Sequence, residues 1–213
     1  MCTATEHRTA SKICKFARFS LNQILILHRR YNERGEAVFM TAALGVIMNT
    51  DTGAQRFYGG KKVRMTSKFE GDELDHHRDD IISMDLSPDR KTAVTGETGQ
   101  KPKVCIWNAE TGEAISHFEL PAGSRGVSAV SISPCGRYVA AVDLHNDHRV
   151  TVYNIQRQKQ LLQMNGSTDR IFDVCWSKRP DDLRFATGSL KQIAFWHPAD
   201  VTKRLKQPGV LGR

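Results

Sequence analysis

Residues 81–118 contain four short apolar runs separated by turn residues, and the rest of the 213-residue chain repeats this arrangement. Ile82, Met84 and Leu86 alternate with polar neighbours, which is the pattern of a strand with one buried face. Ser-Pro-Asp-Arg follows Leu86, and Gly112 closes a later polar turn, so both segments are suited to reversing the chain. This stretch therefore predicts four antiparallel strands, the unit of one β-propeller blade.

The landmarks of this unit recur at regular steps. Ser87-Pro88 recurs as Ser133-Pro134, 46 residues later, and Trp107 recurs as Tyr153 and then Trp196, at steps of 46 and 43 residues. A WD-type propeller blade repeats every 40–45 residues or so, which is close to these steps. Large aromatic side chains usually fill space between packed elements. We therefore expect Trp107, Tyr153 and Trp196 to be buried structural residues of three successive blades.

The repeat predicts an all-β fold, a WD-repeat β-propeller of about four blades with four antiparallel strands each. We divide the chain into a basic N-terminal arm (1–20), a divergent first blade (21–60), a charged inserted loop (61–75), a second blade (76–122), a third blade (123–166), and an incomplete fourth blade with a basic C-terminal tail (167–213). A closed propeller of this type usually has more blades. We therefore expect an incomplete, open propeller that is either part of a longer chain or covered by other chains.

Apolar runs between turn residues give the expected strands of the other blades. In the first blade these are residues 21–27, 37–42, 45–49 and 54–58. In the third blade they are residues 127–133, 138–143, 149–154 and 159–164. In the fourth blade they are residues 171–177, 185–188 and 192–196, after which the strand pattern stops.

The net charge bears on the class of partner, and the cysteine spacing bears on the cellular compartment and on zinc binding. The formal net charge is +8, and a basic surface favours nucleic acid, anionic lipid or acidic protein segments without choosing between them. No apolar run reaches the roughly 18 residues of a membrane span, so we expect no membrane partner. The five cysteines are widely spaced and form no Cys-x-x-Cys pair, which indicates free thiols in a reducing compartment and no zinc site.

Two segments outside the blades are unusual in charge. Residues 1–20 are basic and poor in acidic residues, which fits a disordered arm, a short amphipathic helix or a mitochondrial transit peptide. Residues 61–75 begin basic and end acidic, and they are longer than most connections between blades. This loop is either a solvated insertion or a contact loop for a partner.

Two polar clusters are candidate sites of chemistry, residues 76–80 (HHRDD) and the group Asp143, His145, Asp147 and His148. His77 stands a few residues before a predicted first strand, where a blade carries a structural histidine that hydrogen-bonds toward the tryptophan-bearing strand. Asp147 precedes Tyr153 by six residues, the place of the tight-turn aspartate of a WD blade. Neither cluster has a defined metal-ligand frame, and no nucleophile motif or phosphate-binding loop is present. We expect no catalytic residues, no cofactor, no metal and therefore no enzymatic activity.

Several sequence runs resemble one particular family of WD-repeat proteins. Residues 75–89 (DHHRDDIISMDLSPD), 95–107 (TGETGQKPKVCIW) and 141–150 (AVDLHNDHRV) resemble part of the first propeller of the echinoderm microtubule-associated protein-like family. Residues 195–197 and 206–213 resemble it as well, and residues 21–27 and 37–48 resemble the blade that follows the hydrophobic HELP motif of that family. The sequence shows no sustained heptads, so we do not expect the trimerising coiled coil of the family in these residues.

The resemblance implies a non-enzymatic scaffold that binds tubulin, microtubules or axonemal proteins within a larger assembly. It implies a location in the cytoplasm and cytoskeleton, with the axoneme of a cilium or flagellum as a more specific site, and it does not favour nucleic acid. The basic residues that we expect to meet an acidic partner are Lys61, Lys62, Arg64 and Lys68 in the loop and Lys12, Lys15 and Arg18 in the arm. The alternative is a WD-repeat adaptor in a signalling or ubiquitin-ligase complex.

Overall fold

The described part of the chain is built from β-strands alone. The computed structural model describes residues 30–59, 76–179, 182–197 and 207–208. These residues form four antiparallel sheets, and each sheet has four strands in chain order. None of them forms a helix long and apolar enough to cross a membrane. The prediction of an all-β fold of four-stranded antiparallel blades is confirmed.

Each sheet corresponds to one expected blade. The first contains β1 (Arg30–Tyr31), β2 (Ala37–Thr41), β3 (Leu44–Met48) and β4 (Gln55–Tyr58). The second contains β5 (Ile81–Leu86), β6 (Thr92–Glu97), β7 (Lys103–Asn108) and β8 (Ala114–Glu119). The third contains β9 (Val127–Ile132), β10 (Tyr138–Asp143), β11 (Val150–Asn154) and β12 (Lys159–Met164). The fourth contains β13 (Ile171–Trp176), β14 (Phe185–Ser189), β15 (Ile193–Trp196) and β16 (Gln207–Pro208).

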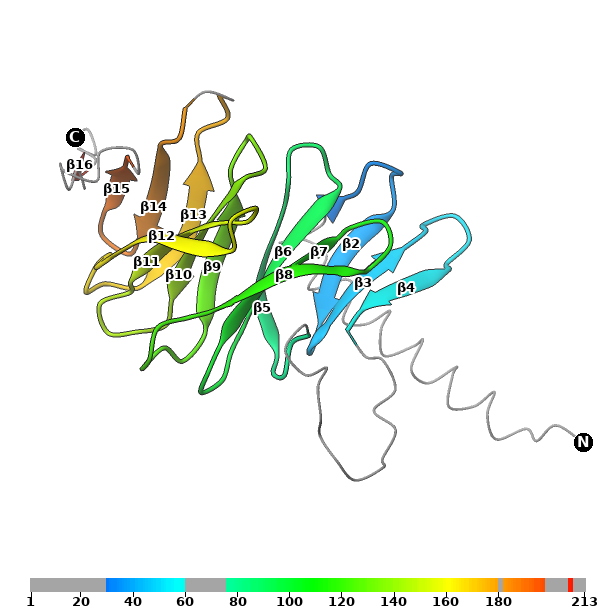
Figure 1. Ribbon diagram of the computed structural model, residues 1–213, viewed down its shortest axis with the longest axis horizontal. Coiled ribbons are helices and arrows are strands. Elements are labelled where there is room, and N and C mark those ends of the chain that lie inside the picture. Colours follow the sequence, from blue (N-terminus) through cyan, green and yellow to red (C-terminus); the bar gives the residue numbers. More distant parts are fainter. Residues whose placement is uncertain (1–29, 60–75, 180–181, 198–206, 209–213) are drawn as a thin grey trace, which may run out of the picture.

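The four blades stand side by side in chain order (Figure 1). The first strands β5, β9 and β13 lie next to one another, so they form the inner edge of the row. The first and fourth blades stand at opposite ends of this row, so the described blades form an open propeller (Figure 1). The division of the chain into these ranges stays a prediction from the sequence, and residues 1–20 and 61–75 lie outside the described residues.

Asparagine and glycine shape the outer hairpins of the first two blades. The Asn108 side chain accepts hydrogen bonds from the backbone N–H groups of Glu110 and Thr111, and Gly112 takes a φ of 77°. Asn49 caps the corresponding turn of the first blade, where Gly53 has a φ of 71°. A side chain at such a φ is strained, and asparagine forms these local turns readily, so the sequence specifies both reversals locally.

Three apolar clusters fill the spaces between neighbouring blades. The cluster between the first and second blades surrounds Trp107, the next surrounds Tyr153, and the last surrounds Trp196. All three aromatic side chains are at most 2% exposed. The core is therefore divided into layers, and each layer is completed only when two blades pack face to face.

The fourth blade differs from its sequence-based description in one strand. The strand pattern was expected to stop after Trp196, but β16 pairs with β15, with Gln207 opposite Phe195 and Pro208 opposite Ala194. A two-residue strand leaves no periodic pattern in the sequence, and proline is tolerated at a sheet edge, where its missing N–H is not needed. The strand expected at residues 21–27 lies outside the described residues.

Candidate functional site

A buried polar network crosses the second blade. The Nε2 atom of His77 lies 2.7 Å from the Thr95 hydroxyl oxygen, and the indole N–H of Trp107 donates to the same oxygen at 3.1 Å. On its other side, His77 Nδ1 lies 3.0 Å from a carboxylate oxygen of Glu97. The network joins the connection before β5 to strands β6 and β7.

Burial determines the protonation states in this network. Burial lowers the pKa of His77, although the hydrogen bond to Glu97 opposes that shift. Burial alone would raise the pKa of the Glu97 carboxyl, but hydrogen bonds from His77 and from the Arg78 backbone N–H hold it below its usual range. A neutral His77 accepts from the Thr95 hydroxyl and donates to Glu97, so each group has a matching partner. The network therefore has a structural role, which is to hold the connection before β5 against strands β6 and β7.

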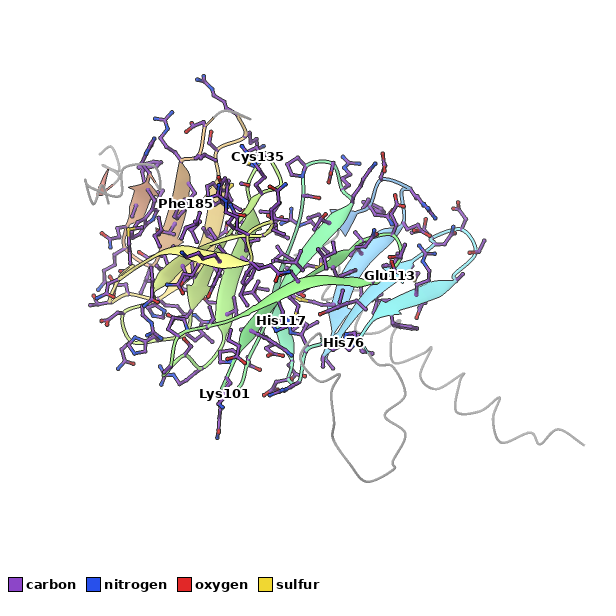
Figure 2. All side chains as sticks on the ribbon, in the orientation of Figure 1. His76, Lys101, Glu113, His117, Cys135 and Phe185 are labelled. Atoms are coloured by element: carbon purple, nitrogen blue, oxygen red, sulfur yellow. The ribbon has the colours of Figure 1, made fainter. Side chains whose placement is uncertain are left out.

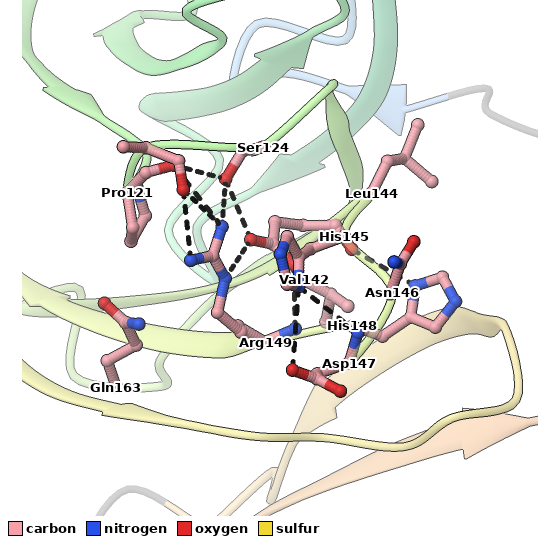
Figure 3. Close-up of polar contacts among 12 residues, drawn as sticks. Pro121, Ser124, Val142, Leu144, His145, Asn146, Asp147, His148, Arg149 and Gln163 are labelled. Carbon is pink, nitrogen blue, oxygen red and sulfur yellow. Dashed lines mark hydrogen bonds and ion pairs between the residues drawn. The ribbon is translucent and has the colours of Figure 1, made fainter.

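A second network holds the loop end of the third blade (Figure 3). The Asp143 carboxylate is fully buried and accepts hydrogen bonds from the Arg149 side chain at 2.7 Å and from the Ser124 hydroxyl at 2.8 Å. The Arg149 guanidinium also donates to the carbonyl oxygens of Pro121 and Ala122. This arrangement ties the hairpin between β10 and β11 to the loop that enters the third blade.

The structure places Asp147 differently from Asp143. The Asp147 side chain is 47% exposed and its carboxylate lies 3.8 Å from His145 Nδ1. Asp147 was the residue that we named from the sequence as the turn aspartate, whereas Asp143 supplies the buried carboxylate of this turn. The sequence placed Asp143 in the same polar cluster but did not identify it as the buried carboxylate, although a charged residue at the end of an apolar strand was a usable signal.

The remaining structural residues each have a polar partner. The Tyr153 hydroxyl donates to the Glu119 carbonyl oxygen at 3.0 Å, and burial raises the pKa of this tyrosine. The Trp196 indole donates to the Thr187 hydroxyl at 2.9 Å. Sequence reasoning did not name Thr95 or Thr187, yet each begins a Thr-Gly pair shortly before the blade's tryptophan, which could have found them.

The surface at the loop ends of the third and fourth blades is hollowed. An open depression of about 450 Å³ lies between them, lined by Asp147, Asn165, Gly166, Ser167, Thr168, Asp169, Lys191 and Gln192. Lys191 Nζ lies 3.3 Å from an Asp169 oxygen at its edge. In the described residues, no three His, Cys, Asp or Glu side chains converge as a metal ion would require. The depression suits contact with another macromolecule better than enclosure of a small ligand.

The seven basic residues expected to contact a partner are not placed by the structure. Lys12, Lys15 and Arg18 belong to residues 1–29, and Lys61, Lys62, Arg64 and Lys68 belong to residues 60–75. Both ranges lie outside the described residues. Their role as contacts therefore remains a prediction from the sequence.

Comparison with known proteins identifies relatives of this chain. The model of the family "WD domain, G-beta repeat" matches residues 70–108, which include His77 and Trp107. The chain is 36% identical over 183 residues to the ciliary WD repeat-containing protein ctxp80 of Euplotoides octocarinatus, which covers 85% of this chain and 25% of that protein.

Two further relatives carry microtubule-associated names. The 77 kDa echinoderm microtubule-associated protein of Strongylocentrotus purpuratus is 29% identical over 184 residues, covering 83% of this chain and 24% of that protein. Echinoderm microtubule-associated protein-like 1 of Rattus norvegicus is 28% identical over 172 residues, covering 76% and 19%. The chain thus spans about a quarter or less of the length of these relatives.

Proposed function

Because this chain is a WD-repeat protein related to the echinoderm microtubule-associated proteins, we propose that it is a non-enzymatic scaffold that binds tubulin or an axonemal protein. The observation that carries this proposal is the similarity to a ciliary WD repeat-containing protein over 85% of the chain. On this proposal the chain acts within a larger assembly, in the cytoplasm and cytoskeleton, and more specifically at the axoneme of a cilium or flagellum.

The geometry supports a scaffold because the polar groups of the blades bind one another. His77 is held by Thr95 and Glu97, and Arg149 is held by Asp143, all with buried or half-buried partners. Such satisfied networks fix the loops between the strands in place. Rigid loops at the ends of packed blades are suited to presenting a surface to another protein.

We assign the candidate contacts to the basic residues outside the described part of the chain. Tubulin carries an acidic surface, and Lys61, Lys62, Arg64 and Lys68 would meet it together with Lys12, Lys15 and Arg18. Each exposed ion pair contributes only about 0–1 kcal/mol. Binding through these residues would therefore be cumulative and weakened by salt.

Co-sedimentation of the full chain with polymerised tubulin tests this function. We expect the chain to pellet with microtubules at low ionic strength and to be released as salt is added. Reversing Lys61, Lys62, Arg64 and Lys68 to Glu should weaken co-sedimentation without changing thermal unfolding. Failure of the unchanged chain to pellet at low salt would contradict microtubule binding and favour an adaptor role in a signalling or ubiquitin-ligase complex.

A further inference from the structure

Three turns of the third and fourth blades meet at one end of the molecule. These are the turns between β9 and β10, β11 and β12, and β13 and β14, and we call this end the upper end, because the first and last of these turns stand uppermost in Figure 1. The backbone N–H of Ile155 donates to the Arg137 carbonyl oxygen at 2.9 Å, which joins the first two turns. The Tyr138 and Trp176 rings stack across the blades with centroids 6.4 Å apart, which brings the third turn alongside.

The upper end of these two blades is rich in exposed cations. They are Arg137, Arg157, Lys159, Lys178, Arg179 and Arg184. Arg184 is neutralised by Asp182, with Nε 2.8 Å from a carboxylate oxygen. Within the described residues the other five form no ion pair with a carboxylate; Asp181, in the same loop as Lys178, lies outside them. This surface therefore carries positive charge that the described blades do not balance.

The upper end of the first and second blades provides a contrast within the same molecule. There the charged residues pair across the boundary between blades: Lys91 Nζ lies 3.1 Å from Glu33, and Arg34 lies 3.0 Å from Glu110. Arg56 pairs with the buried carboxylate of Glu36 in the same region. Among the described residues of the upper end, these cations of the first two blades therefore have carboxylate partners, whereas five cations of the next two blades have none.

The thiol of Cys135 gives a second indication of the positive potential. Cys135 lies in the turn between β9 and β10, at the end of the molecule opposite His76 and Lys101 (Figure 2). Burial alone would raise the pKa of this thiol, but hydrogen bonds from Ser133 and Arg137 and the charge of Arg137 lower it. A negatively charged group is therefore stabilised at this turn.

We propose that the upper end of the third and fourth blades is a docking surface for an acidic protein segment. Nucleic-acid sites commonly interleave cations with aromatic side chains for base stacking. The turns 133–137, 155–158 and 177–184 contain no aromatic residue, which favours a carboxylate-rich peptide. If the acidic segment belongs to tubulin, this surface is the site that carries out the proposed function, and in that case the inference rests on the proposed function.

A matched pair of triple variants of the full chain tests the surface. The upper-end variant is Arg157→Glu, Lys159→Glu and Lys178→Glu, and the control variant is Lys101→Glu, Arg125→Glu and Arg170→Glu at the opposite end. Both variants change the net charge equally and alter exposed side chains, so thermal unfolding should stay near that of the unchanged chain. The probe is a fluorescent polyglutamate peptide. Its anisotropy is measured at low salt and again at about 0.15 M, where exposed charges more than about 8 Å apart are largely screened.

We expect the upper-end variant to lose about tenfold or more in affinity for the peptide at low salt, and the control to lose less than about threefold. Equal losses would show a response to net charge alone and would overturn the proposal, as would unchanged binding in the upper-end variant. Tighter binding of an oligonucleotide of equal charge than of the peptide would assign the surface to nucleic acid and would also overturn it.

Co-sedimentation of the unchanged chain and of the upper-end variant with microtubules distinguishes failure of this inference from failure of the proposed function. If the unchanged chain does not pellet with microtubules but its peptide affinity depends on the upper end, the proposed function fails and the docking surface stands. If the unchanged chain and the upper-end variant pellet equally well, microtubule binding stands and the upper end is not the surface that contacts tubulin. That result would overturn the inference that the upper end is the site of tubulin binding.

Discussion

The indole of Trp107 in the second blade lies parallel to the phenol ring of Tyr58 in the first, with ring centroids 5.0 Å apart and an interplanar angle of 1°. The same relationship recurs between Phe118 and Tyr153, with centroids 4.4 Å apart. In each pair, the last strand of one blade supplies one ring and the third strand of the next blade supplies the other. The aromatic residue of a blade is thus a contact to its neighbour.

Replacing Trp107 by Ala should therefore destabilise the protein strongly. Deletion of a large buried aromatic side chain costs about 3–5 kcal/mol, and here it also leaves the Thr95 hydroxyl without its indole donor. Trp107→Phe is the matched variant, because it keeps a ring against Tyr58 and loses the N–H donor. We expect its loss to be smaller. Urea unfolding measures both, and a midpoint for Trp107→Ala equal to that of the unchanged protein would refute the assignment.

Two aspartates of one hairpin should differ sharply in their contribution to stability. Asp143→Ala leaves the half-buried Arg149 without its carboxylate, and breaking a buried ion pair costs about 3–5 kcal/mol. Asp147→Ala alters an exposed side chain and should change the free energy of unfolding by no more than about 0.5 kcal/mol. Thermal or urea unfolding of the two variants compares them directly. Equal losses would show that Asp143 is not the residue that holds the turn.

Asp85 should couple three blades at their inner edge. One carboxylate oxygen lies 3.0 Å from Arg30 of the first blade, and the other accepts from the Ser131 hydroxyl and the Ile132 N–H of the third. Asp85→Ala leaves the buried Ile132 donor unpaired, so we expect a loss of about 1–3 kcal/mol. Because Arg30 is 43% exposed, its removal should cost less, about 0–1 kcal/mol for Arg30→Ala. A larger effect of Arg30→Ala in urea unfolding would contradict this order.

Stability should decrease as the pH falls from neutral, in part through His77. The folded pKa of His77 is lowered by burial, so below the ordinary value of about 6.5 the unfolded chain binds a proton that the folded chain does not. The contribution of the neutral imidazole is fully present above that value. It is lost as the pH falls from there through the lowered folded pKa.

The variant His77→Gln isolates this contribution. It should be less stable than the unchanged protein at neutral pH, because the contacts to Thr95 and Glu97 are altered. Its unfolding free energy should nevertheless change less between about pH 7.5 and pH 5.5, since one shifted proton-binding group is gone. Equal pH dependence in the two proteins would show that His77 does not titrate differently in the folded and unfolded states.

The positions of most strands were predictable from local sequence. Short runs between turn residues marked the strands Tyr138–Asp143 and Lys159–Met164 at the bounds that the structure shows. The signal is local because a strand that is buried on both faces, such as Tyr138–Asp143, reads as a continuous apolar run bounded by turn residues. The two-residue strand Gln207–Pro208 could not be found in this way, since pairing with Phe195 and Ala194 alone defines it.

By itself, the sequence determined a repeated four-stranded unit and the large aromatic residue that three of the four units bury. Only the tertiary structure decided which carboxylate of the third blade is buried, that Arg30 meets Asp85, and that Lys91 and Arg34 pair with carboxylates across the boundary between the first two blades. The strands follow from the chemistry of neighbouring residues. The polar contacts join groups on different strands and different blades, and their partners are set by how the blades pack.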